Sequence, residues 1–267
     1  MIPLKLWLER YIEIASIMGY DITYDRKATK IFAEKLKAYC IEPPLNNLQE
    51  LLSGRPAMIF GAGPSLDDSI DRLLRISPNF SETFTLITAD GATQALVERK
   101  KIPQIIVTDL DGDIDSLLYS AERGSILMVH AHGDNIEKIR RHMDEIISAT
   151  KLIVGTTQVE PIPPLQNFGG FTDGDRAVFV ASNLEASPII LVGMDFGKVV
   201  GKRSKPWLTR DISAWEDKQK KLKIAYELVS WLATDFNSTI YTTSENVPPG
   251  TRRLHLEEIN NILRCHP

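Results

Sequence analysis

The sequence predicts an α/β protein with a Rossmann-like, mostly parallel sheet, flanked by helices and preceded by a helical N-terminal segment. From residue 57 onward, short apolar runs alternate with amphipathic stretches, which is typical of βαβ units. Before that residue only helical periodicity is present. The composition, with 43% hydrophobic and 25% charged residues, is that of a globular protein.

The N-terminal segment, residues 1–54, is expected to consist of three helices. In the first helix, apolar residues recur on one face at Leu4, Trp7, Leu8, Tyr11, Ile12, Ala15 and Met18. A second helix is expected from about Arg26 to Ala38, and a short third helix from Leu45 to Leu52. Gly54 and Pro56 mark the end of the segment.

The remaining residues, 55–267, are expected to form one α/β catalytic domain. The apolar runs that indicate strands are residues 57–60, 85–88, 104–107, 126–129, 151–154, 188–192 and 238–242. Runs that are apolar almost throughout suit strands that are covered on both faces. Because ligands in such folds bind beyond the carboxyl ends of the strands, the residues directly after each run are the first candidates for a functional site.

Charge and composition argue against several classes of protein. The formal net charge is −4, from 31 basic and 35 acidic residues, so no global attraction to nucleic acid or to an anionic membrane is expected. Nothing approaches the roughly 20 consecutive apolar residues that span a bilayer, and Glu9 and Glu13 interrupt any signal-peptide pattern. Cys40 and Cys265 form neither a disulfide framework nor a zinc motif. We expect a cytoplasmic protein with small-molecule substrates, compatible with a homo-oligomer.

A glycine-containing turn follows the first predicted strand, in "GAGPSLDDS". Glycines before a helix N-terminus form a ready anion site, and Ser65 is a suitable N-cap. We therefore expect Gly61, Gly63, Pro64 and Ser65 to contact phosphate; the alternative is an ordinary βα turn. This is not the dinucleotide fingerprint, because Leu66 stands where the third glycine would be, and the chain has no GxxxxGK[ST] motif.

Aspartates follow most of the other predicted strands. In "TDLDGDIDS", Asp109, Asp111, Asp113 and Asp115 stand at alternate positions, and carboxylates this close together need a cation. The aspartates at the other strand ends are Asp90, Asp134, Asp173, Asp175 and Asp195. Oxygen ligands suit Mg²⁺ that also binds phosphates. We expect Asp109, Asp111 and Asp113 to hold Mg²⁺ carrying the triphosphate of a nucleotide such as ATP.

Two other metal sites are considered and disfavoured. From Asp111 the sequence approaches an EF-hand loop, but Ser116 stands where the sharp turn needs glycine. "HAHGDN" approaches a binuclear HxHxDH site, but Asn135 stands where the last histidine would be. His130 and His132 are therefore expected to form hydrogen bonds, to face phosphate or to be structural.

Two basic stretches lie in the C-terminal third. "GKVVGKRSKPWLTR" contains Lys202, Arg203 and Lys205 and no acidic residue; it is either a solvated loop or a mobile lid that closes on the triphosphate. "DKQKKLK", residues 217–223, is expected to be the exposed face of a helix.

Six motifs in one order carry a family resemblance: "FGAGPSLD", "ITADGA", "IPQIIVTDLDGD", "HAHGDN", "GGFTDGDRA" and "LVGMDFG". Between about residues 57 and 225 they resemble the archaeal-type 6-hydroxymethyl-7,8-dihydropterin pyrophosphokinases, and part of the order also resembles thiamin pyrophosphokinase. The resemblance implies a pyrophosphokinase domain that transfers the β,γ-pyrophosphoryl group of ATP, with Mg²⁺, to the hydroxymethyl oxygen of a reduced pterin and releases AMP.

The resemblance also assigns expected roles to residues. Its catalytic residues fall on Asp90, Asp109, Asp111 and Asp134. The further candidates for binding the substrates are His132, Thr172, Asp173, Arg176, Lys202 and Arg203. Candidates for pterin contact are Asp173, Asp175, Asp195, Phe171 and Trp207. Two alternatives stay open: a glycosyltransferase that uses the Asp109–Asp111 D-x-D pair, and a nucleotide-binding module without catalysis.

Overall fold

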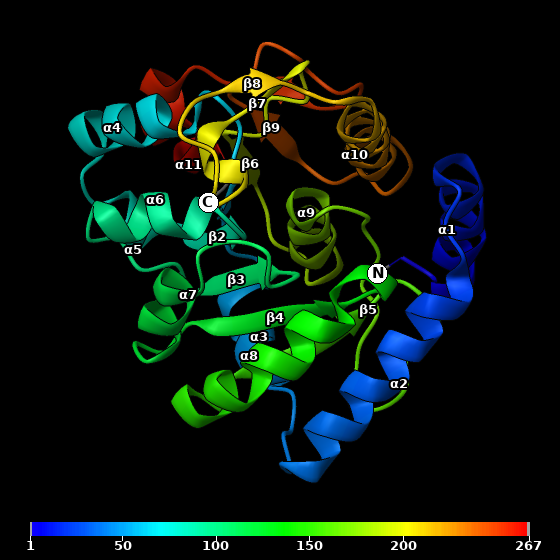
Figure 1. Ribbon diagram of the computed structural model, residues 1–267. Helices are drawn as coiled ribbons and strands as arrows, with labels where there is room; N and C mark the ends of the chain where they lie inside the picture. Colours follow the sequence, from blue (N-terminus) through cyan, green and yellow to red (C-terminus); the bar gives the residue numbers. More distant parts are fainter. Residues whose placement is uncertain (1, 266–267) are drawn as a thin grey trace.

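The computed structural model describes residues 2–265, and its centre is an eight-stranded sheet in the order β10-β9-β6-β1-β2-β3-β4-β5 (Figure 1). All neighbouring strands of this sheet are parallel. Its strands are β1 (Ala57–Phe60), β2 (Thr85–Ala89), β3 (Ile105–Thr108), β4 (Ile126–Ala131), β5 (Ile153–Thr157), β6 (Ile189–Val192), β9 (Ile240–Thr242) and β10 (Arg252–Arg253). The predicted α/β fold with a parallel sheet is therefore confirmed.

The helices of the described chain are α1 (Leu4–Met18), α2 (Ile22–Ala38), α3 (Leu45–Leu52), α4 (Leu66–Ile76), α5 (Phe80–Thr83), α6 (Ala92–Glu98), α7 (Ile114–Ala121), α8 (Ile136–Ala149), α9 (Asp173–Asn183), α10 (Glu216–Asp235) and α11 (Ile259–Cys265). Each of the seven apolar runs overlaps a strand of the sheet. The sequence did not predict β10 or the separate hairpin of β7 (Val199–Val200) and β8 (Ile212–Ser213), because strands of two residues leave no periodic signal.

The N-terminal helices form as predicted, with two corrections. The face of α1 that packs inward consists of Trp7, Tyr11, Ile14 and Ala15, whereas Leu4 and Ile12 of the predicted face are exposed. The buried stripe is narrower than the apolar stripe, because only one side of α1 meets the core. Helix α2 begins at Ile22, before the predicted start, because the Asp21 side chain caps it by accepting a hydrogen bond from the backbone N–H of Thr23.

Helices cover both faces of the sheet. Figure 1 shows α4, α6, α7 and α8 following one another along one side, with α9 and α10 on the other. Strand side chains alternate between the layers: Ile59 and Ile87 pack with α1, α3, α9 and α10, whereas Met58 and Leu86 pack with α4, α5 and α6. Helix α2 packs against the β4–β5 edge through Phe32. The N-terminal helices thus contribute to both cores; the boundary at residue 54 stays a prediction.

The topology brings several strand ends to one place. The chain builds β1 to β5 in spatial order, then α9 leads back to β6 on the other side of β1. The strand order therefore reverses between β1 and β6, where doubly wound folds bind ligands. Residues 198–214, which include β7 and β8, lie over these strand ends, between α6 and α10 (Figure 1). We call this segment the arm.

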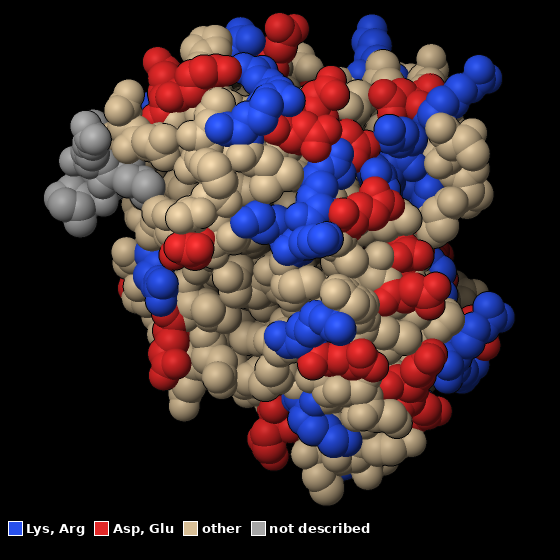
Figure 2. Space-filling view, turned by 90° about the vertical axis from the view of Figure 1, so that its left-hand side faces the viewer, with Lys and Arg blue, Asp and Glu red and all other residues tan. Residues whose placement is uncertain are grey.

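The surface charges and the lengths of the helices relate to the expected location and partners of the protein. Figure 2 shows acidic and basic side chains interspersed over the side of the molecule that carries α4, α6 and α7. Within residues 2–265, no helix is both long and apolar enough to cross a membrane. The cytoplasmic location and the homo-oligomer stay predictions.

Candidate active site

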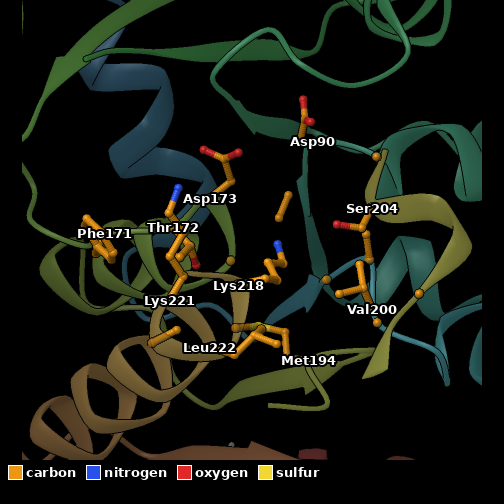
Figure 3. A pocket seen from close by; sticks show the side chains of 18 of the residues that line it. Asp90, Phe171, Thr172, Asp173, Met194, Val200, Ser204, Lys218, Lys221 and Leu222 are labelled. Atoms are coloured by element: carbon orange, nitrogen blue, oxygen red, sulfur yellow. The ribbon is translucent and has the colours of Figure 1, made fainter. Parts of the chain in front are cut away.

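A cleft of about 210 Å³ lies at the carboxyl ends of the strands. Its walls come from the turns after β1, β2, β3, β4 and β6, from the start of α9, from the arm and α10, and from Tyr20 between α1 and α2. Figure 3 shows Asp90 and Asp173 at the same end of this pocket, with Lys218 reaching into it from α10. The predicted location of the functional site beyond the strand ends agrees with this cleft.

Three carboxylates form a cluster in the cleft. Each of Asp90, Asp109 and Asp173 has one carboxylate oxygen within 4.8 Å of an oxygen of the other two. Asp90 follows β2, Asp109 follows β3, and Asp173 is the first residue of α9. Asp90 has a left-handed backbone, with φ of 40°, and its Oδ1 accepts a hydrogen bond of 2.6 Å from the Thr108 hydroxyl. A Cβ on Gly112 would lie 2.7 Å from Asp90 Oδ2, so this glycine makes room for the carboxylate.

The repulsion between the carboxylates of the cluster favours the binding of a cation. Burial and the charges of Asp109 and Asp173 raise the pKa of Asp90 well above its usual value. Burial and the Asp109 charge raise the pKa of Asp173 to about 7, although Arg176 lies 2.9 Å away and opposes this shift. Carboxylates that crowd each other in this way are relieved by a positive charge between them.

Asp109 shows where such a charge would sit. Burial works against its ionisation, but the hydrogen bond with His132, at 3.2 Å, and the charge of Arg176 hold the pKa of Asp109 below its usual range. Its other oxygen, Oδ1, is buried and has no hydrogen-bond partner in the described part of the chain. An ionised carboxylate with an orphaned oxygen, in a cluster with two further carboxylates, fits a hard divalent cation such as Mg²⁺.

The aspartates of the sequence run have different partners. Between the first two, Leu110 is left-handed, with φ of 64°, and turns the chain as its side chain enters the core. Asp111 is ion-paired with Lys205 and lies 3.5 Å from Lys138. Asp113 caps α7 by accepting from the backbone N–H of Ser116 at 2.9 Å. Of the expected set, Asp109 joins Asp90 and Asp173 in the cluster, Asp111 lines the same cleft in an ion pair, and Asp113 is occupied as a helix cap.

The glycine turn after β1 lines the cleft but does not offer its amides to a phosphate. The N–H groups of Gly61 and Gly63 donate to the carbonyls of Val192 and Gly193, at 2.9 and 2.8 Å. The N–H and hydroxyl of Ser65 both donate to Asp195, at 2.9 and 2.6 Å. The anion at the start of α4 is thus Asp195 of the protein itself. The phosphate contacts expected of Gly61, Gly63, Pro64 and Ser65 lack the free donors that they require.

Of the three basic residues expected to face the triphosphate, Lys202, Arg203 and Lys205, only Lys205 lines the cleft. Arg203 forms ion pairs with Asp67 of α4 and Glu98 of α6, at 3.1 and 2.6 Å, and Lys202 also pairs with Asp67. These two residues fasten the arm to the helices and do not line the cleft, whereas Lys205 does. Burial works against the charge of Lys205, but Asp111 beside it raises the pKa of the ammonium group. Mobility of the arm stays a prediction.

Two lysines of α10 that were expected to be exposed to solvent line the cleft. Lys218 and Lys221, three residues apart, line the cleft, whereas Lys220 and Lys223 of the same stretch are exposed. Lys218 has no ion pair among the residues that the structure describes, and burial together with the charge of Lys205 lowers its pKa. Apolar residues at the same helical spacing, such as Leu222 and Ala225, were the signal that this face points inward.

The remaining predicted residues fall into two groups. His132, Thr172, Asp173 and Arg176 line the cleft, and Asp134 lies at its exposed rim. His130 is buried behind the cleft, and Asn135 joins the β3 and β4 ends by donating to the carbonyls of Asp109 and His130.

Among the candidates for pterin contact, Phe171, Asp173 and Asp195 line the cleft. Asp175 is buried and accepts from the backbone N–H groups of Phe171 and Thr172, so it caps α9. Asp195 is engaged by Ser65, and Trp207 is 67% exposed on the arm and does not line the cleft. These three side chains are therefore not free to meet a ligand in the cleft.

Comparison with known proteins agrees with the motifs. The profile of a family described as MptE-like, 6-hydroxymethylpterin diphosphokinase MptE-like, matches residues 30–201. The chain is 42% identical, over 88% of its length and 96% of the relative, to a 6-hydroxymethyl-7,8-dihydropterin pyrophosphokinase of Pyrococcus furiosus. It is 39% identical to the protein of the same name from Methanothermobacter thermautotrophicus, over 85% of this chain and 94% of that one.

A solved structure shares the fold. The MAf glycosyltransferase from Magnetospirillum magneticum AMB-1 superimposes with a TM-score of 0.52 and 15% identity. The match covers 77% of this chain but 34% of that chain, so the present chain spans about a third of its length. At this identity the likeness shows a common fold and nothing about the reaction.

Proposed function

Because the chain belongs to the family of MptE-like 6-hydroxymethylpterin diphosphokinases, we propose that its cleft transfers pyrophosphate from Mg²⁺-bound ATP to the hydroxymethyl oxygen of 6-hydroxymethyl-7,8-dihydropterin. The observation that carries this proposal is a charge arrangement. A cluster of three carboxylates with an orphaned oxygen and an unpaired lysine both line one cleft. Such a site suits a ligand that is itself a complex of a divalent cation with a polyphosphate.

Asp90, Asp109 and Asp173 would hold the metal. When bound, Mg²⁺ neutralises charge on the phosphate chain and fixes its geometry for in-line displacement. Arg176 supports this set by donating from Nη1 to Asp173 at 2.9 Å, and His132 by its hydrogen bond to Asp109. These contacts orient the ligand carboxylates before substrate arrives.

Lys205 and Lys218 would bind the phosphate oxygens. Lys218 carries a desolvated ammonium group without an ion pair in the described structure, and an anion in the cleft supplies the missing partner. Lys205 extends from the arm over Asp111, so it can contact a phosphate that lies beside the metal. Neither role falls to Lys202 or Arg203, which fasten the arm.

The reaction follows from this placement. The hydroxymethyl oxygen attacks the β-phosphorus, the bond from that phosphorus to the bridging α,β oxygen breaks, and AMP leaves with the bonding electrons. Asp134 lies at the rim, where its carboxylate can accept the proton that the alcohol loses. Positioning and charge stabilisation account for most of the catalysis in phosphoryl transfer, so no covalent intermediate with the protein is needed.

The geometry disfavours the glycosyltransferase alternative. A D-x-D site needs both carboxylates at one metal, but two lysines contact Asp111, whereas Asp109 belongs to a cluster with Asp90 and Asp173. No feature of the cleft specifically favours a sugar nucleotide over ATP.

The proposal is tested by resolving the nucleotide products of a reaction with ATP, Mg²⁺ and 6-hydroxymethyl-7,8-dihydropterin. We expect AMP and a pterin diphosphate in equal amounts. ADP as the main product, or ATP consumption that does not depend on the pterin, would contradict the proposal. A parallel reaction with a sugar nucleotide in place of ATP should give no product.

A further inference from the structure

The cleft has two chemically different ends. Figure 3 shows Phe171 and Val200 on opposite sides of the pocket, with Lys218 between them. The end at Val200 is lined by the arm and by Met194, and it is largely aliphatic. The end at Phe171 is aromatic, since Tyr20 lies there with its ring centroid 6.2 Å from that of Phe171.

Tyr20 is held in place by the junction of two helices. Helix α1 ends at Gly19, which is left-handed with φ of 70°, and the N–H of Tyr20 donates to the carbonyl of Ala15 at 2.8 Å. The next residue, Asp21, already caps α2. With a helix end on each side, the Tyr20 backbone has little freedom, and its ring is presented to the cleft beside Lys221, whose Nζ lies 5.7 Å from the ring centroid.

A buried hydrogen-bond chain ties the N-terminal helices to the carboxylate cluster. The Tyr11 hydroxyl donates to Asp25 and accepts from Gln158 Nε2 at 2.7 Å. Gln158 Oε1 in turn accepts from Arg176 at 3.1 Å, and Arg176 holds Asp173. Helices α1 and α2, and with them Tyr20, are therefore fixed relative to the metal-binding end of the cleft.

The geometry of the reaction decides which substrate belongs at which end. In an in-line displacement the acceptor and the leaving AMP lie on opposite sides of the β-phosphorus. The attacking oxygen must approach this phosphorus to about 3–3.5 Å. The acceptor ring must therefore lie next to the metal ligands, whereas the nucleoside is further away by an α-phosphate and a ribose. Phe171 precedes the ligand Asp173 by two positions in the chain, so the aromatic end of the cleft adjoins a metal ligand.

We propose that Tyr20 and Phe171 form the binding surface for the acceptor ring, so that the N-terminal segment completes the acceptor site. This inference rests on the proposed function. A flat, bicyclic, neutral heteroaromatic ring is the class of ligand that stacks on aromatic side chains, whatever its hydrogen-bond pattern. The aliphatic end at Val200 and Met194 then receives the nucleoside. Tyr20 lies outside residues 30–201, which match the family profile, so the profile does not assign it a role.

The test measures binding without turnover. The acceptor is 6-hydroxymethyl-7,8-dihydropterin, titrated by its own fluorescence in the presence of Mg²⁺ and α,β-methylene-ATP, whose α,β bridge cannot be cleaved. Tyr20→Leu should weaken acceptor binding roughly tenfold, the loss typical of one aromatic stacking partner. Tyr20→Phe keeps the ring and should bind the acceptor as the wild type does. The affinity for α,β-methylene-ATP should not change in either variant.

Tyr24→Leu is the matched control, because Tyr24 belongs to the same segment but is 58% exposed and does not line the cleft. Acceptor affinity that is equal in Tyr20→Leu and Tyr24→Leu would overturn the inference, as would a loss of nucleotide affinity in place of acceptor affinity. A wild-type protein that binds the nucleotide analogue but no pterin would instead overturn the proposed function, and the inference with it.

Discussion

At the scale of single residues, the cleft contains unpaired groups of opposite charge. Asp109 Oδ1 is buried without a partner, and Lys218 has no ion pair in the part of the chain that the structure describes. Asp111 and Lys205, by contrast, already neutralise each other. Unpaired buried groups are unfavourable for folding, so their presence together at one site is best explained by a ligand that satisfies both.

Lys218 is expected to contribute to nucleotide binding and not to stability. Lys218→Met keeps the length of the side chain and removes the charge, so the affinity for Mg-ATP should fall on the order of 10- to 100-fold, the usual value of a hydrogen bond to a charged group. The free energy of unfolding of the ligand-free protein should stay the same or rise, because a desolvated charge is removed. Calorimetric titration and chemical denaturation measure the two effects.

The control for this prediction is Lys220→Met on the same helix, because Lys220 is exposed and pairs with Glu216 at 2.8 Å. It should bind Mg-ATP as the wild type does. Equal affinities in the two variants would show that Lys218 does not meet the phosphates.

His130 makes stability depend on pH. Its side chain is 2% exposed, and burial, followed by the charges of Arg176 and His132, lowers its pKa well below the usual value. The unfolded chain therefore takes up a proton below about pH 6.5 that the folded protein does not. The contribution of a neutral His130 is complete above that pH and is lost as the pH falls.

Melting temperatures between pH 8 and pH 5 test this prediction. As the pH falls, the free energy of unfolding of the wild type should decrease more steeply than that of His130→Gln. The difference should amount to about 1.4 kcal/mol for each unit by which the pKa of His130 is lower in the folded than in the unfolded protein. His142→Gln, a half-buried histidine of α8, is the control and should follow the wild type. Parallel curves for wild type and His130→Gln would contradict the prediction.

At the scale of elements, the arm is held by specific contacts at its base. Arg203 bridges Asp67 and Glu98, and its carbonyl lies so close to Gly91 that no Cβ could fit there. The consequence is that Lys205, two residues further on, is fixed above Asp111. Lys202, Arg203 and Lys205 were all expected to contact the triphosphate, but the first two anchor the arm and only Lys205 lines the cleft.

Arg203→Ala should release the arm without unfolding the protein. We expect faster backbone hydrogen exchange across residues 199–213 and a several-fold higher KM for ATP, because Lys205 is no longer positioned; the melting temperature should change little, since these ion pairs are partly solvated. Arg210→Ala, an exposed arm residue, is the control. Unchanged exchange in Arg203→Ala would show that the anchor lies elsewhere.

Helix α1 is expected to be part of the core. Trp7 is 1% exposed, packs edge-on against Phe179 of α9 with ring centroids 5.4 Å apart, and donates from Nε1 to the carbonyl of Gln158. Trp7→Ala should lower the free energy of unfolding by about 3–5 kcal/mol. Leu6→Ala, at a position that is 40% exposed, should change it by less than about 0.5 kcal/mol. A small effect of Trp7→Ala in chemical denaturation would mean that the segment is stable independently of the core.

At the scale of the whole molecule, topology determines which residues meet. The sequence predicted the sheet and the rim of strand ends, because apolar runs and βα turns are local signals. It also predicted Asp90, Asp109 and Asp173 as individual site residues. Their grouping could not be predicted, since Asp173 reaches the ends of β2 and β3 only after the chain has completed β5 and returned through the loop that precedes α9.

The differences between the expected and the observed contacts have the same origin. Asp109, Asp111 and Asp113 were expected to act together, but Asp111 is paired with Lys205 and Asp113 caps α7. The amides of the glycine turn looked free, but Asp195 and the β6 end, more than a hundred residues away, occupy them. Contacts between distant segments leave no trace in local spacing, so only the structure reveals them.

The central claim is that carboxylates from β2, β3 and α9 form one metal site. Titration of the protein with Mn²⁺, followed by electron paramagnetic resonance, tests it most directly. Asp109→Asn and Asp173→Asn should each weaken Mn²⁺ binding by more than about tenfold. Residues that only support a metal ligand already cause about a tenfold loss when they are replaced, so the ligands themselves should cause a larger one. Asp113→Asn, which alters a helix cap, should bind Mn²⁺ as the wild type does. Normal Mn²⁺ binding in Asp173→Asn, together with weakened binding in Asp113→Asn, would contradict the account.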